Sequence, residues 1–92
     1  MAIHPGVILE EDFVKPSGAT NAQIAKALGI PRSRLWELMN GRRGITPQMA
    51  LRLERVFEKP ALDWLIAQAL WDLAQLSSVG GQPLRGLDGE RT

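Results

Sequence analysis

The clearest structural signal in this chain lies at residues 21–43, NAQIAKALGIPRSRLWELMNGRR. It predicts two short helices, Asn21–Leu28 and Arg32–Asn40, because in each the apolar residues recur three and four positions apart. The inward faces are formed by Ile24, Ala25 and Leu28 in the first helix and by Leu35, Leu38 and Met39 in the second. Thr20 and Gln23 form a capping-box pattern at the start of the first helix, which supports that boundary.

Only three residues separate the two helices, and the first of them, Gly29, can end a helix in a left-handed conformation. Two helices joined in this way form a helix-turn-helix motif, whose second helix contacts base edges in the DNA major groove. The outward residues of the second helix are Arg32, Ser33, Arg34 and Glu37. The spacing alone also fits an ordinary helical hairpin with solvated arginines, so both interpretations stay open at this point.

Charge is concentrated in the same part of the chain. Residues 21–59 carry eight Lys and Arg against three Glu, a net charge of +5, whereas the segments 1–20 and 60–92 each carry −2. A basic middle between acidic ends is expected of a surface that binds a polyanion, although the net charge of the whole chain is only +1.

Composition argues against several other kinds of site. The chain has no Cys and a single His, His4, so we expect no disulfide and no metal site, and we interpret His4 as the local start of a helix. It has no Gly-rich phosphate loop and no clustered carboxylates, so we expect no enzyme, no cofactor and no small-molecule substrate. No segment is long enough to span a membrane and the first residues are no signal peptide, so we expect a cytoplasmic protein.

The rest of the chain adds three helices to an all-α fold. The first is predicted over Pro5–Val14 and is broken by Lys15–Gly18. Thr46 and Pro47 are strong start signals for a helix over Pro47–Phe57. Pro60 precedes the last helix, Ala61–Leu76.

The last helix is apolar on too many sides for a helix that covers a core with one face. We expect part of it to form a two-fold dimer interface through Trp64, Ile66, Leu70, Trp71 and Leu73. The alternative is that this helix is central to the core of a monomer. With the dimer interpretation, residues 1–76 form one DNA-binding and dimerisation domain. The Gly-rich segment 77–92 is predicted to form a flexible C-terminal tail.

Several separated segments of the chain match one known family in the right order. They are HPG at 4–6, IAKALGI at 24–30, NGRRGIT at 40–46, PQMALRL at 47–53 and W-L-x-x-Q-x-x-W-D-L at 64–73. With these segments the chain resembles the HigA-type antitoxins, within the phage-repressor-like (XRE) helix-turn-helix family. The resemblance implies a five-helix lambda-repressor-like fold, a homodimer formed through the last helix, and repression of the protein's own operon through double-stranded operator DNA. It also implies neutralisation of a HigB-like toxin that cleaves mRNA.

The resemblance also implies roles for individual residues. Asn21 stands where a phosphate contact is expected, and Asn40, Arg42 and Arg43 match positions that contact the DNA backbone. Arg32, Ser33, Arg34 and Glu37 occupy the positions that contact bases, where Arg can bind guanine through two hydrogen bonds and Glu can accept from cytosine N4.

Three positions depart from the family pattern. Pro31 stands where Ser or Thr is usual, Glu37 replaces a residue that is often polar or basic, and Trp36 is an unusual neighbour of the base-contacting positions. Trp36 has three open interpretations: it supports the helix, contacts a thymine methyl group, or binds something other than DNA. Two alternative functions therefore stay open, an XRE-family transcriptional regulator without a toxin partner and an interaction module that has lost DNA binding.

Overall fold

The computed structural model describes residues 2–77 and 80–84, and over these residues the only regular secondary structure is helical. The predicted all-α class is therefore confirmed. Of the predicted tail, 77–92, residues 78–79 and 85–92 lie outside the described residues, and residues 80–84 form no helix or strand. Within the described part of the chain, no helix has the length and apolar character needed to cross a membrane.

The first helix is longer than predicted. It consists of three consecutive segments, α1 (Pro5–Ile8), the π-helical η1 (Leu9–Val14) and α2 (Lys15–Ser17), and it ends at Gly18 with φ +73°. The predicted break after Val14 was wrong because Pro16 lies inside the helix. An α-helical proline clashes with the carbonyl four residues before it, and the wider π-helical turn leaves room for the proline ring.

The two central helices have nearly the predicted bounds, α3 (Asn21–Leu28) and α4 (Arg32–Met39), with Asn40 as the C-cap of α4. Both capping-box bonds are present: the Gln23 amide donates to Thr20 Oγ1 at 3.1 Å, and the Thr20 amide donates to Gln23 Oε1 at 2.9 Å. Gly29 ends α3 with φ +72°.

The last two helices are α5 (Pro47–Phe57) and α6 (Ala61–Gln75). The bounds of α5 are as predicted, and its cap is Thr46, whose Oγ1 accepts from the Met49 amide at 3.2 Å. The start of α6 is capped from α5, because the Glu54 carboxylate accepts from the Ala61 amide at 3.1 Å. With α1, η1 and α2 counted as one helix, the described residues contain five helices, as predicted.

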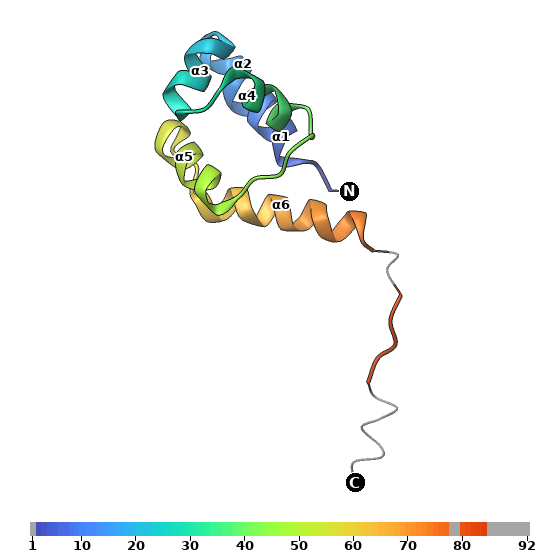
Figure 1. The fold of residues 1–92 in the computed structure, drawn as a ribbon. Helices are drawn as coiled ribbons and strands as arrows, with labels where there is room; N and C mark the ends of the chain where they lie inside the picture. The colour runs from blue at the N-terminus through green and yellow to red at the C-terminus, as the bar shows by residue number, and fades with distance from the viewer. Residues whose placement is uncertain (1, 78–79, 85–92) are drawn as a thin grey trace.

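The helices surround one core (Figure 1). Its fully buried large side chains are Leu9, Leu28, Leu35, Leu38, Leu53 and Trp64. Trp64 is 0% exposed and its ring centroid lies 5.4 Å from that of Phe13, so its predicted place in a dimer interface was wrong. One face of the first half of α6, with Trp64, belongs to the core, so the alternative interpretation holds for that face only. The end of α6 projects past the other helices (Figure 1). Along the helix, Ile66, Leu70 and Leu73 are 48%, 58% and 66% exposed.

The first residues are fixed between α4 and α6. His4 caps α1, as predicted, because its Nδ1 accepts from the Gly6 amide at 2.9 Å. The His4 ring lies edge-on to Trp71 with 5.3 Å between the ring centroids. Gly6 touches the backbone of α4: a Cβ atom at this position would lie 1.8 Å from the carbonyl oxygen of Leu38. The HPG segment therefore packs α1 against both α4 and α6.

Candidate nucleic-acid interface

The outward face of α4 is fixed by the core residues on its other face. Leu35 and Leu38 are 0% exposed and Met39 is buried, so the helix cannot rotate without exposing them. The 3.6-residue period then directs Arg32, Ser33 and Arg34 into solvent, and all three are exposed. The predicted base-contacting positions in the first turn of α4 therefore lie on the surface.

The first turn of α4 also presents backbone donors. Its N-cap is Pro31, which provides no side-chain cap, and the Pro31 carbonyl accepts from the amides of Arg34 and Leu35 at 3.0 and 3.2 Å. The N–H groups of the first helical residues have no acceptor within a helix. Pro31 thus leaves these donors, together with the positive end of the helix dipole, to bind an anion from solution.

The end of α4 folds the following residues back over the helix. Gly41 has φ +69°, the Arg42 amide donates to the Glu37 carbonyl at 2.8 Å, and the Gly41 amide donates to the Leu38 carbonyl at 3.3 Å. These bonds form a Schellman motif, which normally brings the residue after the turn against the last full turn of the helix. Here that residue is Arg42, whose guanidinium carbon lies 5.7 Å from the centre of the Trp36 ring.

The Trp36 ring therefore lies beside the end of α4, which fits one of the three interpretations left open by the sequence, that it supports the helix. Its side chain is 51% exposed, and its carbonyl accepts from Asn40 Nδ2 at 2.8 Å. Asn40 thus uses one amide donor to cap α4. The next arginine is held differently, because Arg43 Nη2 lies 3.3 Å from Glu37 Oε1 in an ion pair whose side chains are 48% and 37% exposed.

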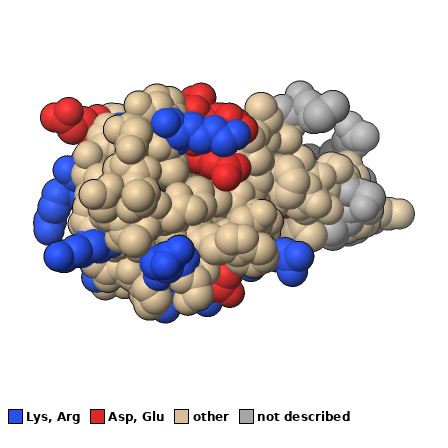
Figure 2. Space-filling model, turned by 90° about the horizontal axis from the view of Figure 1, so that it is seen from above, with Lys and Arg blue, Asp and Glu red and all other residues tan. Residues whose placement is uncertain are grey.

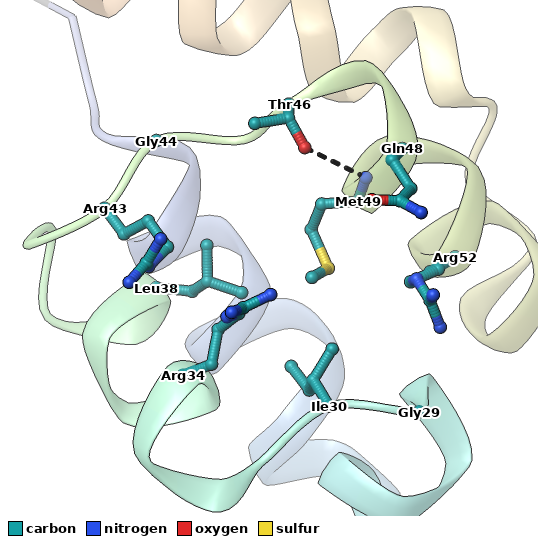
Figure 3. Close-up of a pocket in the computed structure, with 10 residues that line it drawn as sticks. All are labelled: Gly29, Ile30, Arg34, Leu38, Arg43, Gly44, Thr46, Gln48, Met49 and Arg52. Atoms are coloured by element: carbon teal, nitrogen blue, oxygen red, sulfur yellow. Dashed lines mark hydrogen bonds between the residues drawn. The ribbon is translucent and has the colours of Figure 1, made fainter.

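Three guanidinium groups surround a pocket of about 100 Å³ between α4 and α5 (Figure 3). Arg34 and Arg43 border it on the α4 side and Arg52 on the α5 side, and apolar side chains including Ile30, Leu38 and Met49 also line it. The sequence pattern did not assign Arg52 to this place. The residue is recognised only from the fold, because its Nη1 donates across helices to the Leu28 carbonyl at the end of α3, at 2.9 Å.

The loop between α4 and α5 is held by α6. Gln68 Oε1 accepts from the Ile45 amide at 2.7 Å, and Gln68 Nε2 donates to Asp72 Oδ1 at 2.8 Å. These contacts explain much of the spacing W-L-x-x-Q-x-x-W-D-L: Trp64 fills the core, Gln68 fixes the loop, and Trp71 packs against His4. The pattern is visible in the sequence, but these roles follow only from the packed fold.

The predicted site residues are only partly brought together. Arg42, Arg43 and Glu37 lie at the end of α4, and Arg34 from the first turn of α4 borders the same pocket as Arg43. Asn21 is exposed at the start of α3, at the opposite end of that helix from Gly29. Many Lys and Arg side chains gather along the lower and left edges of Figure 2, whereas most acidic side chains in view lie toward its upper side.

A comparison with protein families matches the helix-turn-helix family HTH_3 over residues 13–64. The chain belongs to this helix-turn-helix family. The match includes both helices of the motif and α5, and it extends to Trp64 in α6.

Individual relatives agree with the predicted resemblance. Virulence-associated protein I of Dichelobacter nodosus is 47% identical over 72 residues, which is 78% of this chain and 67% of that protein. A HigA-family addiction module antidote protein from Coxiella burnetii has a TM-score of 0.75 at 32% identity, over 90% of this chain and 100% of that one. The antitoxin HigA of Pseudomonas aeruginosa, solved with the higBA promoter, has a TM-score of 0.74 at 28% identity, over 91% and 99%. The resemblance to HigA-type antitoxins is confirmed.

Proposed function

We propose that this chain is the antitoxin of a HigBA-like toxin–antitoxin module. In this proposal it binds operator DNA as a homodimer, represses its own operon in the cytoplasm and neutralises a HigB-like, mRNA-cleaving toxin. The observation that carries the proposal is the solvent-facing first turn of α4, which combines two arginines with uncapped backbone donors on a fold similar to HigA antitoxins.

The residues of the interface divide by the kind of contact that each can make. The first turn of α4 enters the major groove, where Arg32, Ser33 and Arg34 contact base edges. Phosphates are bound from both ends of the motif, by Asn21, Asn40, Arg42 and Arg43. The phosphate contacts set the register of the protein on the duplex, and the base contacts select the sequence.

The exposed face of α6 supports the proposed homodimer. Ile66, Leu70 and Leu73 recur four and three positions apart, so they share one helical face, and each is about half exposed or more. Trp71 on the same helix is half-buried against His4 and contributes the edge of the interface. Covering this apolar face by the same face of a second copy gives a two-fold dimer, which matches a palindromic operator.

Base selection is tested with Arg34→Ala on the DNA upstream of the gene and on a scrambled duplex. We expect a loss of about 1–3 kcal/mol on the upstream DNA and a smaller loss on the scrambled DNA, because a base contact exists only in the correct sequence. Arg55→Ala is the matched control, since Arg55 is an exposed arginine on α5 that does not line the pocket beside α4. Equal weakening on both duplexes would show that Arg34 contacts only phosphate.

The dimer is tested with two leucines of equal exposure. Leu70 on α6 and Leu51 on α5 are 58% and 57% exposed. In sedimentation experiments at micromolar concentration we expect Leu70→Glu to be monomeric and Leu51→Glu to remain dimeric. A monomeric wild-type protein at that concentration would refute the proposed dimer.

The toxin partner is tested by growth. The small open reading frame next to this gene is induced with and without this chain, and its expression is verified. Growth arrest that this chain relieves supports the antitoxin function. Expression of the neighbour without arrest favours a transcriptional regulator without a toxin, and DNA binding is then the remaining function.

A further inference from the structure

The Schellman turn at the end of α4 places two arginines over two residues of the same helix. Arg42 lies over Trp36, and Arg43 pairs with Glu37. The backbone bonds at Gly41 and Arg42 fix both placements. The two arginines are thus positioned before any DNA arrives, but by partners of different charge.

Because of this difference in charge, Arg42 and Arg43 differ in how readily they can bind a DNA phosphate. The face of an indole ring is neutral overall, so Arg42 keeps its full charge toward solvent. The Glu37 carboxylate compensates the charge of Arg43. Because both side chains of this ion pair are more than a third exposed, its stabilisation is small, and a phosphate can replace the carboxylate.

Replacing the carboxylate has a consequence for Glu37 itself. Arg43 borders the same pocket as Arg34, next to the face of α4 that meets DNA (Figure 3). When Arg43 turns to a phosphate, the carboxylate stays on α4, close to the DNA and without its cation. Like charges then repel unless the DNA offers a hydrogen-bond donor, such as the N4 amino group of cytosine.

We propose that Glu37 is a specificity-determining residue that acts through Arg43 and makes binding to the wrong DNA sequence less favourable. This inference rests on the proposed DNA-binding function. On DNA without a suitable donor, Glu37 competes with phosphate for Arg43 and repels the backbone once it is displaced. On the operator, a base donor compensates the carboxylate, so the penalty falls mainly on other sequences.

The experiment compares wild type and Glu37→Gln on the upstream DNA and on a scrambled duplex over a series of salt concentrations. Glutamine keeps the size of the side chain and removes the charge. We expect binding of Glu37→Gln to the scrambled duplex to tighten by about two- to fivefold, the range for an exposed ion pair, with less gain on the upstream DNA. The salt slope on the scrambled duplex should steepen by up to about 0.9, because Arg43 then displaces one more counterion.

Glu11→Gln is the matched control. Glu11 pairs with Lys15 at 2.9 Å on the first helix, and those side chains are 52% and 60% exposed. This variant changes the net charge equally and breaks a similar ion pair away from α4, so we expect affinities and salt slopes like those of wild type. A second comparison, Arg43→Ala with Arg43→Ala/Glu37→Gln, should show a smaller effect of the Glu37 change, since the competition for Arg43 is lost and only the direct repulsion by the carboxylate remains.

The results that overturn the inference are distinct from those that overturn the proposed function. Equal gains for Glu37→Gln on both duplexes, or no change on the scrambled duplex, overturn the specificity role while DNA binding stands. An undiminished effect of the Glu37 change without Arg43 overturns the action through Arg43. Wild-type protein that binds neither duplex in a salt-dependent way overturns the DNA-binding function and the inference together.

Discussion

Replacing Gly6 by Ala should destabilise the fold, because α1 and α4 touch at this residue. The added Cβ atom would lie 1.8 Å from the Leu38 carbonyl oxygen, whereas ordinary contacts begin at 3.4 Å. The two backbones must therefore separate by about 1.6 Å at this point. The carbonyl belongs to a helix whose side chains at Leu35 and Leu38 are fully buried, so it cannot move without disturbing the core.

The size of the effect follows from two opposing contributions. An extra methyl group in a packed interior typically costs about 1–3 kcal/mol. We take the upper end, about 3 kcal/mol, because the new Cβ atom would clash with a backbone oxygen and not with a flexible side chain. Alanine recovers up to about 1 kcal/mol through its higher helix propensity. The net loss of unfolding free energy for Gly6→Ala is about 2 kcal/mol, or roughly 8–16 °C in Tm for a chain of this length.

The assay is thermal and urea unfolding followed by circular dichroism, with all variants at one protein concentration because dimerisation would shift the midpoint. Gly80→Ala is the control, since a Cβ atom at Gly80 meets nothing within 4 Å, and it should change stability by less than about 0.5 kcal/mol. If Gly6→Ala unfolds at the same temperature as wild type, the close approach of α1 and α4 is not a real constraint.

Three further predictions concern local features of the fold. Glu58→Gly should raise the unfolding free energy by about 1 kcal/mol in urea titrations, because Glu58 ends α5 at φ +62°; a decrease would contradict strain at this residue. Burial lowers the pKa of His4 below its ordinary 6.5, and the negative charge of Asp72 opposes this shift with a smaller effect. Below pH 6.5 the unfolded chain therefore binds more protons than the folded chain, and the free energy of unfolding should fall as the pH drops through 6.5. Titrations in urea over a pH series should show this loss for wild type and much less of it for His4→Asn, which keeps a capping acceptor; identical pH dependence would exclude His4 as its source. Arg52→Ala should lower the free energy of unfolding by about 1–2 kcal/mol in thermal unfolding, because the hydrogen bond to the Leu28 carbonyl is lost. Arg52→Lys should recover part of this loss. An unchanged unfolding free energy in Arg52→Ala would show that the bond is not stabilising.

The sequence was a good guide wherever the signal was local. The start of α3 follows from Thr20 and Gln23, and the start of α5 from Thr46 and Pro47, because a capping bond joins residues only three positions apart. The side of α4 that faces solvent follows from its apolar period alone. For this reason the outward placement of Arg32, Ser33 and Arg34 could be predicted.

The sequence was a poor guide to apolar residues with more than one possible neighbour. Trp64 and Leu70 lie on one helix in similar sequence surroundings, yet one is 0% and the other 58% exposed. Hydrophobicity favours burial but does not say against what, and the answer depends on Phe13, which is 51 positions away in the chain. The extension of the first helix past Val14 was missed for a related reason, because a π-helical turn can accommodate a proline that normally breaks a helix.

Local sequence signals were enough to predict the helix-turn-helix, the all-α class and the set of basic residues from which the proposed interface is built. The pairing of those residues is visible only in the packed fold: Arg42 with Trp36, Arg43 with Glu37, and Arg52 with the end of α3. Helical periodicity and capping act over one turn of chain. The partner of an exposed charge depends on a turn geometry and on helix packing that no short pattern contains.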